Sequence, residues 1–365
     1  MNARISEIVS EARASPLLLL LAFVPLCLVG EHVWPERHTL LFVLSVLAIV
    51  PLAALLSRAT ESVADRTGQA VGGLLNATLG NLTELVIALT ALQAGQYMLV
   101  KASIAGAIVT NTLFMLGGAF LIGGLKHHEQ QYNRVSARLQ AGLLFLATVA
   151  LLVPSLLAEA ESRSTMLQPL SLGLAVLLIV AYGLGMLFAL GTHKEALASV
   201  GHAESAETPW PIPVALAVLA TVTLLVALVS EVFVASVQHA AETLGMTPAF
   251  VGFVIVALVS AAAEMTTAFS AAARDQLDLS VSIALGSAAQ IALFVAPLLV
   301  LLSYVIGPTP MNLQFWPGAI AMMLIATLAA TLMTNGGRSA WFVGVMILMV
   351  YAIFALALFL LPPVA

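Results

Sequence analysis

The stretch GGLLNATLGNLTELVIALTAL, residues 72–92, decides how this chain folds, because it places the carboxylate of Glu84 inside an otherwise uncharged apolar segment. A charged side chain in a bilayer core costs roughly 2.5 kcal/mol or more, so an acid found there is expected to have a function. Gly80, Asn81 and Thr83 lie within one helical turn of Glu84, so amide and hydroxyl oxygens share its face. Hard cations prefer oxygen ligands of this kind. The stretch therefore predicts a cation site within a membrane-spanning helix.

The composition is that of a membrane protein. The 365 residues are 61% hydrophobic and 8% charged, and the mean hydropathy is +1.07. Such segments must satisfy their own backbone, and apolar runs of about 18 to 27 residues are too long for barrel strands, which indicates helices. The fold class is therefore predicted to be an all-α membrane protein. No basic patch favours nucleic acid, and a lone Cys27 excludes a disulfide framework or a cysteine metal site.

Hydropathy predicts about eleven transmembrane helices, one leading helix followed by two sets of five. They are expected at about 15–33, 38–57, 72–92, 99–125, 139–158, 168–191, 213–238, 251–273, 279–306, 315–333 and 341–361. The leading run ends in charged residues and Pro35 rather than in a small-residue cleavage site, so we interpret it as an uncleaved helix.

Polar stretches divide the chain into four predicted parts. Residues 1–57 form a tail and two helices, the second of which is a candidate for the start of the first repeat, and 58–191 form the remainder of that repeat. Within it, residues 58–68 are expected to be a charged, amphipathic connection. A polar linker at 192–209 is predicted to be cytoplasmic, and 210–365 form the second repeat.

Basic residues are distributed unequally between the two sides of these predicted helices. With the N-terminus inside, ten of them fall inside: Arg4, Arg13, Arg58, Arg66, Lys126, Arg134, Arg138, Lys194, Arg274 and Arg338. Three fall outside: Arg37, Lys101 and Arg163. The positive-inside rule then predicts a cytoplasmic N-terminus and an external C-terminus.

An internal repeat relates the two halves. Displacing the chain by 180 residues aligns 67–114 with 247–294 without a gap, and pairs Glu84 with Glu264 and Gly106 with Gly286. Twelve identities result, at 67/247, 71/251, 72/252, 77/257, 84/264, 88/268, 91/271, 96/276, 99/279, 106/286, 113/293 and 114/294. The paired helices are five crossings apart, and an odd number inverts orientation. We therefore predict an inverted-topology repeat whose two glutamates converge at the bilayer midplane.

Two carboxylates that meet in a low dielectric cannot both stay ionised without a counter-charge. Neither glutamate has a lysine or arginine within its own helix, so the pair must hold protons or share a cation. Thr110, Asn111, Ser287 and Gln290 add neutral oxygens beside the glycine pair, and Ca²⁺ takes six to eight oxygen ligands. Competition between a cation and protons for the same oxygens is itself an exchange mechanism, so the residues predict an antiporter.

The motifs resemble those of the Ca²⁺/H⁺ exchangers in the cation/Ca²⁺ antiporter superfamily. The similarity extends over nearly the whole chain after the first helix and is carried by these residues: LNATLGNLTE at 75–84, KAS at 101–103 with Asn111, THK at 192–194, SE at 230–231 and IALGSAAQI at 283–291. It implies ion ligation by Glu84 and Glu264, with Asn81 and nearby backbone carbonyls, and a polar lining from Asn111 and Gln290.

The candidate site follows from the residues and the resemblance together. It comprises Glu84, Glu264, Asn81, Gly80, Ser260, Asn111, Gln290 and Ser287, with Glu231 as a candidate for ion access. The expected partners are Ca²⁺, protons and the lipid bilayer, with no resident cofactor and no enzymatic activity. The resemblance further implies a prokaryotic plasma membrane protein, and the oligomeric state is left open.

The second glutamate motif departs from the family pattern. Ser260 replaces the usual glycine, Ala261 replaces the usual asparagine and Met265 stands where a histidine is common, so one amide oxygen is missing. Gly336 and Arg338 also stand where the family carries acids. An Na⁺ or broad-specificity cation/H⁺ antiporter is therefore an alternative. Remoter alternatives are a passive cation channel and an intramembrane enzyme, for which no HExxH motif or aspartate dyad is present.

Overall fold

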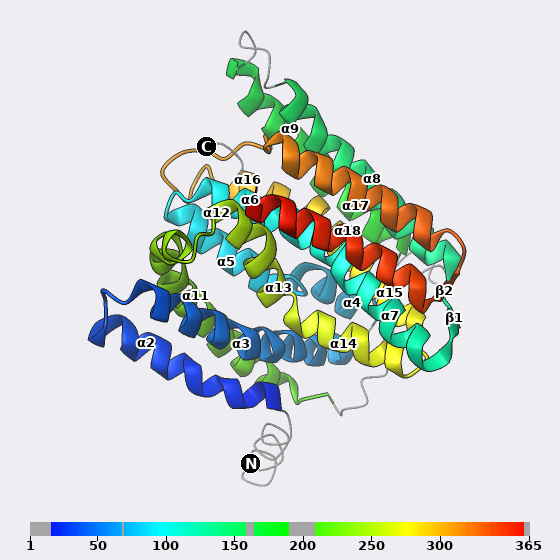
Figure 1. Cartoon of the computed structure of the whole chain (residues 1–365), viewed down its shortest axis with the longest axis horizontal. Helices are drawn as coiled ribbons and strands as arrows, with labels where there is room; N and C mark the ends of the chain where they lie inside the picture. The colour runs from blue at the N-terminus through cyan, green and yellow to red at the C-terminus, as the bar shows by residue number, and fades with distance from the viewer. Residues whose placement is uncertain (1–15, 68, 158–163, 190–208, 361–365) are drawn as a thin grey trace.

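A computed structural model describes residues 16–67, 69–157, 164–189 and 209–360 and shows a bundle of long helices (Figure 1). The first half contains η1 Pro16–Ala22, α2 Phe23–Val33, α3 His38–Thr67, α4 Gln69–Leu79, α5 Leu82–Gln93, α6 Tyr97–Val109, η2 Thr110–Met115, α7 Leu116–His127, β1 Glu129–Gln131, α8 Arg134–Leu157 and α9 Ser164–Leu187. The second contains α11 Ile212–Thr243, α12 Pro248–Phe250, η6 Val251–Val256, α13 Ala257–Ser260, α14 Ala262–Ala273, α15 Leu277–Gln290, η7 Ile291–Val295, α16 Ala296–Leu302, α17 Pro317–Thr334, β2 Arg338–Ala340 and α18 Trp341–Leu360.

Every apolar segment that the sequence predicted is helical in the part of the chain that is described, which confirms the all-helical membrane fold. Eight helices are long and apolar enough to cross a membrane, and a pair bent by 57° makes up to nine. The first and third predicted helices are built instead from shorter apolar pieces, which include 19–33 and α5. The predicted linker 192–209 lies almost wholly outside the described residues.

Three of the predicted details are wrong. Residues 58–67 continue α3 rather than form a connection, because Ala59, Thr60, Val63 and Ala64 maintain a buried face at helical spacing. Two short strands, β1 and β2, pair antiparallel where only a loop was expected.

The two helices expected to carry the glutamates are not continuous, which is the third correction. The first breaks at Gly80 and Asn81, between α4 and α5, and the second breaks at Ala261, between α13 and α14. Each break begins a new helix just before its glutamate. Broken helices at the membrane midplane are the usual way in which transporters expose backbone groups to an ion.

The bundle has two distinct ends, which we name from their features. The sheet end carries the β1–β2 pair, together with the Arg338–Glu129 ion pair of 3.2 Å. There Lys126 Nζ and Gln130 Nε2 donate to the carbonyl oxygens of Ala273 and Ala272, at 2.7 and 3.0 Å, which ties α7 and β1 to the last turn of α14. The loop end carries residues 303–316, which connect α16 to α17.

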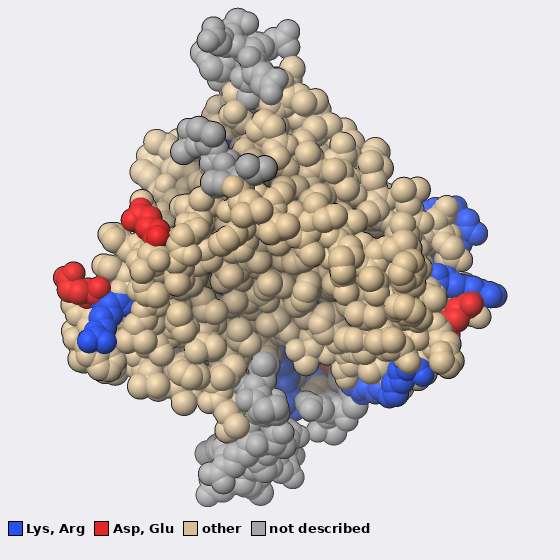
Figure 2. All heavy atoms as spheres, viewed as in Figure 1, with Lys and Arg blue, Asp and Glu red and all other residues tan. Residues whose placement is uncertain are grey.

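Charged side chains concentrate at the periphery of the bundle. On the face in Figure 2 they lie at the left and right edges and low in the view, with a broad uncharged surface between them. The described basic residues predicted to lie inside group toward the sheet end: Arg58, Arg66, Lys126, Arg134, Arg138, Arg274 and Arg338. Arg58 lies over the Trp210 ring, whose backbone carbonyl accepts from Arg66. Arg37 and Lys101 lie at the loop end, and Arg4, Arg13, Arg163 and Lys194 fall outside the described residues. The charge separation therefore exists in three dimensions.

Candidate functional site

The two glutamates occupy equivalent positions in two half-helices. Glu84 lies in the first turn of α5 and Glu264 in the first turn of α14, and both side chains are partly buried. Both carboxylates therefore lie at the N-terminal ends of half-helices, where backbone N–H groups have no partner within the helix. The last carbonyl groups of α4 and α13 come just before the two breaks and are potential cation ligands.

The fold brings the two glutamates together from the two repeats. Glu264 is close enough to Glu84 for the two carboxylates to repel each other. The hydroxyl of Ser260 faces Glu84, and that of Ser287 lies beside Glu264. Each glutamate is thus accompanied by a serine, which places four of the candidate residues in one site.

Amide side chains join the repeats through a hydrogen-bonded chain. Asn111 Nδ2 donates to Ser287 Oγ at 2.9 Å, and Ser287 Oγ donates to Asn81 Oδ1 at 2.8 Å. Asn81 Nδ2 in turn donates to Gln290 Oε1 at 2.7 Å. The side chain of Gln290 also lies near Gly80, 3.7 Å from where a Cβ would be. Six of the eight predicted site residues thus belong to this network or to the glutamate pair, while Ser260 faces Glu84 and Gly80 lies against the network.

Two site oxygens, Glu264 Oε2 and Asn111 Oδ1, are buried and have no hydrogen-bond partner among the described residues. Buried acceptors are normally satisfied, so orphaned oxygens in a polar cluster are candidates for binding an ion. No group of three or more His, Cys, Asp or Glu side chains among the described residues is arranged to hold a metal. A cation here would therefore depend on two carboxylates and neutral oxygens.

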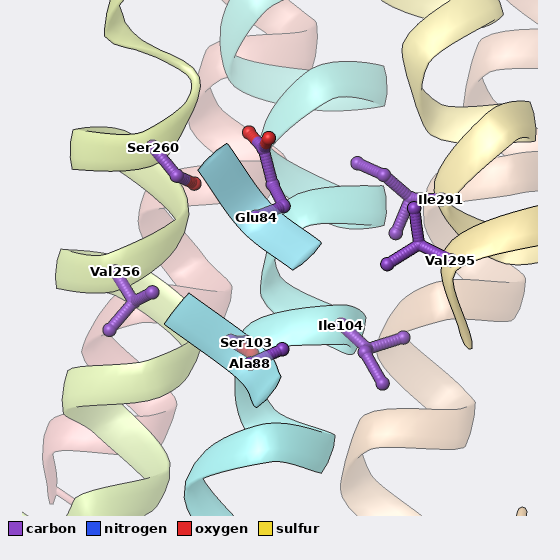
Figure 3. Close-up of a pocket in the computed structure, with 8 residues that line it drawn as sticks. All are labelled: Glu84, Ala88, Ser103, Ile104, Val256, Ser260, Ile291 and Val295. Atoms are coloured by element: carbon purple, nitrogen blue, oxygen red, sulfur yellow. The ribbon is translucent and has the colours of Figure 1, made fainter. Parts of the chain in front are cut away.

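A small cavity lies beside Glu84, on the side of the site toward the loop end. It is lined by Glu84, Ala88, Ser103, Ile104, Val256, Ser260, Ile291 and Val295, and holds about 10 Å³ of water-sized space. Figure 3 shows the Glu84 carboxylate and the Ser260 hydroxyl at one end of it, with Ser103 and apolar side chains around the remainder. The space is near the minimum for a single water molecule, so this side of the site is nearly closed.

Glu231 is not brought to the site. It is exposed on α11 and does not line the cavity, so its predicted part in ion access stays a prediction. Glu61, which the sequence analysis missed, lies on the sheet-end part of α3 and is close enough to Glu264 to repel it. Continuing the apolar spacing of α3 beyond residue 57 would have placed Glu61 on a helix near the site.

Ser287 is the centre of the amide chain, and its removal tests whether that chain organises the site. Ser287→Ala leaves the Asn81 oxygen and the Asn111 amide without their partner, which should destabilise the protein by about 1–3 kcal/mol and lower its melting temperature by several degrees. Ser45→Ala is a matched control, because the buried Ser45 hydroxyl bonds only the carbonyl of Phe42 in its own helix. Equal melting temperatures for the two variants would contradict the proposed organisation.

Comparison with known proteins agrees with this arrangement. A family model described as "Sodium/calcium exchanger protein" matches residues 37–191 and 214–360. The chain belongs to this exchanger family. A Ca²⁺/H⁺ antiporter of Synechocystis sp. is 41% identical to this exchanger, over 94% of this chain and 97% of the relative. The Ca²⁺/H⁺ antiporter ChaA of Bacillus subtilis is 38% identical, over 94% and 98%.

Solved structures share the fold of this exchanger. The structure described as native YfkE matches with a TM-score of 0.82 at 35% identity, covering 94% of this chain and all (100%) of the other. The resemblance to Ca²⁺/H⁺ exchangers drawn from the motifs is therefore confirmed. Since the family consists of transporters, the exchanger is not an enzyme.

Proposed function

We propose that this exchanger moves Ca²⁺ across the membrane in exchange for H⁺, with Glu84 and Glu264 holding either the ion or protons. The observation that supports this most directly is the approach of two carboxylates on half-helices from opposite repeats. The names of the bacterial relatives point to the same pair of substrates. Asn81, Asn111, Ser260, Ser287, Gln290 and the backbone near Gly80 would supply the neutral oxygens.

Exchange follows from competition for these oxygens. Binding of Ca²⁺ requires ionised carboxylates, so loading the ion releases protons, and protonation from the other side releases the ion. The two repeats then move so that the site opens to one side of the membrane at a time, loaded with either Ca²⁺ or protons. Glu61 lies between Glu264 and the sheet end, so we propose it as a carboxylate through which cargo enters from that end.

The experiment uses purified exchanger in vesicles. An imposed pH gradient should drive Ca²⁺ uptake, and collapse of the gradient with a protonophore should stop it. Uptake that ignores the gradient would favour a passive channel and contradict antiport. We further propose that the sheet end faces the cytoplasm of a prokaryotic plasma membrane, because the basic residues gather there.

Ala261 favours a second candidate function, exchange of Na⁺ or several cations for H⁺. It is the repeat mate of Asn81, is 0% exposed, and contributes no side-chain oxygen. We expect Ala261→Asn to raise the preference for Ca²⁺ over Na⁺ by roughly threefold to tenfold, which corresponds to one added polar ligand. Competition of Na⁺, K⁺ and Mn²⁺ with Ca²⁺ in the vesicle assay measures this preference.

Ala261→Val is the control for added side-chain volume at this buried position. It adds volume without an oxygen and should not raise the preference. If both variants change selectivity equally, packing rather than a missing ligand explains the effect of Ala261.

A further inference from the structure

The half-helices that precede the two glutamates are repeat mates, yet they pack differently. The segment α12–α13 packs along α6, whereas its mate α4 packs against α3 and makes at most marginal contact with α15, the mate of α6. Their backbone differs too, because η6 is π-helical while the corresponding part of α4 is regular. One half-helix is therefore docked on the opposite repeat and the other is not.

The exposure of equivalent side chains records the same difference. Val71 on α4 is 52% exposed, while its mate Val251 is 0% exposed. Leu74 is 49% exposed, while its mate Val254 is 8% exposed. In an inverted repeat, unequal packing of equivalent segments is expected when one side of the site is closed and the other open. Here α12–α13 closes the loop end, and the described part of the chain supplies no equivalent closure at the sheet end.

Two paired glycines mark where closure happens. A Cβ on Gly106 of α6 would overlap the carbonyl oxygen of Phe253, so this glycine allows two backbones to touch. At its mate Gly286 on α15, the nearest atom to such a Cβ is Gln140 Oε1, 3.8 Å away. Among the described residues, Gly286 therefore has no backbone against it, although Gly106, its mate, does.

The surroundings of Gly286 are incomplete in a second respect. Gln140 Oε1 is buried and has no hydrogen-bond partner among the described residues, and Gln140 as a residue is 5% exposed. Native proteins rarely leave such an acceptor unsatisfied. An unsatisfied acceptor beside an uncovered glycine indicates a surface that another segment covers in a different state.

We infer that α4 packs against Gly286 of α15 when the exchanger closes its sheet end. The backbone at residues 72 and 73 would make this contact. The contact of Gly106 with Phe253 indicates which part of α4 would face Gly286, since residue 73 is the repeat mate of Phe253. Gly72 now lies against the backbone of Ala64 on α3, so α4 leaves this contact as it docks. The inference rests on the proposed antiport, because only alternating access requires the second state.

The test compares Gly286→Ala with Gly106→Ala and uses Val71→Cys as a reporter of α4. Cys27 is 0% exposed, so it should not react with a maleimide added to purified protein in detergent. Gly286→Ala fits the present state but obstructs docking, so Val71→Cys should stay reactive while Ca²⁺ uptake falls at least tenfold. Equilibrium binding of radioactive Ca²⁺ should be retained. Gly106→Ala obstructs the present state instead, so reactivity of Val71→Cys should fall roughly tenfold.

Controls distinguish an effect on the docking of α4 from a loss of protein stability and from the identity of the transported ion. On α8, a Cβ at Gly142 would have no atom of the described residues within 4 Å, so Gly142→Ala should change neither Ca²⁺ uptake nor the labelling of Val71→Cys. If Gly106→Ala does not fold, Gly252→Ala replaces it, because its Cβ would lie 2.6 Å from that of Ala102. Three results would each overturn the inference. They are wild-type Ca²⁺ uptake by Gly286→Ala, loss of Ca²⁺ binding by Gly286→Ala, and loss of Val71→Cys reactivity in the Gly286→Ala background. Val71→Cys should stay reactive in Gly286→Ala and lose reactivity in Gly106→Ala whichever ion is transported. This part of the test therefore holds even if Ca²⁺ is not the substrate.

Discussion

Replacement of Glu84 or Glu264 by glutamine should reduce Ca²⁺ uptake driven by a pH gradient roughly a hundredfold or more. Glutamine keeps the size and hydrogen-bonding capacity of the side chain but removes the charge and the exchangeable proton. A divalent ion would then face a single carboxylate in a partly buried site that is nearly closed toward the loop end. Removing one partner of a buried pair of opposite charges, here a carboxylate beside the bound cation, costs about 3–5 kcal/mol, which is the basis for the expected loss.

The measurement is uptake into vesicles at matched protein density, with Glu242→Gln as the control. Glu242 is an exposed acid near the loop end of α11, so its replacement removes a carboxylate from the surface rather than from the site. The control should retain uptake. Substantial uptake by either Glu84→Gln or Glu264→Gln would remove the basis of the proposed mechanism.

The long apolar segments were predictable because each carries its own signal. Runs such as α17 and α18 need no tertiary information, since lipid requires every backbone group to be paired within the helix. The meeting of Glu84 with Glu264 was also predictable, since it follows from the repeat and the number of crossings. Family membership was predictable from the motifs around Glu84 and Gly286.

The breaks in the glutamate helices were not predicted, for two different reasons. Gly80 and Asn81 are weak helix formers, and the pair could have suggested an interruption. Ala261 lies in an alanine-rich run that favours a helix, so nothing local marks the second break. There, tertiary packing overrides propensity, and only the repeat relationship to Asn81 could have revealed it.

Packing differences between repeat mates were equally hidden. The π-helical segments η2 and η7 follow equivalent points of the two repeats, whereas η6 has no such counterpart in α4. Sequence identity between mates such as Val71 and Val251 predicts equal environments, and the structure gives them unequal ones. We infer that this asymmetry belongs to one of the two conformations that the proposed antiport requires, so it cannot be read from residues that serve both.

Ca²⁺ binding to the purified exchanger should weaken steeply as the pH falls. An ion-free site holds protons on its carboxylates, and the ion must displace them, so a lower pH raises the cost of binding. Each proton displaced per ion changes the apparent dissociation constant by about tenfold per pH unit, so displacement of two gives about a hundredfold. The sign follows from this competition: affinity increases with pH until the ion-free site no longer carries protons, and is constant above that.

Calorimetry in buffers with different ionisation enthalpies counts the protons released per Ca²⁺ bound. Wild-type exchanger should release between one and two where affinity changes most steeply, and the Glu84→Gln and Glu264→Gln variants should each release fewer. A binding constant that is unchanged between about pH 5.5 and 8.5 would mean that the ion and the protons do not share oxygens. Antiport would then require separate proton and Ca²⁺ sites, and the approach of Glu84 to Glu264 would need another explanation.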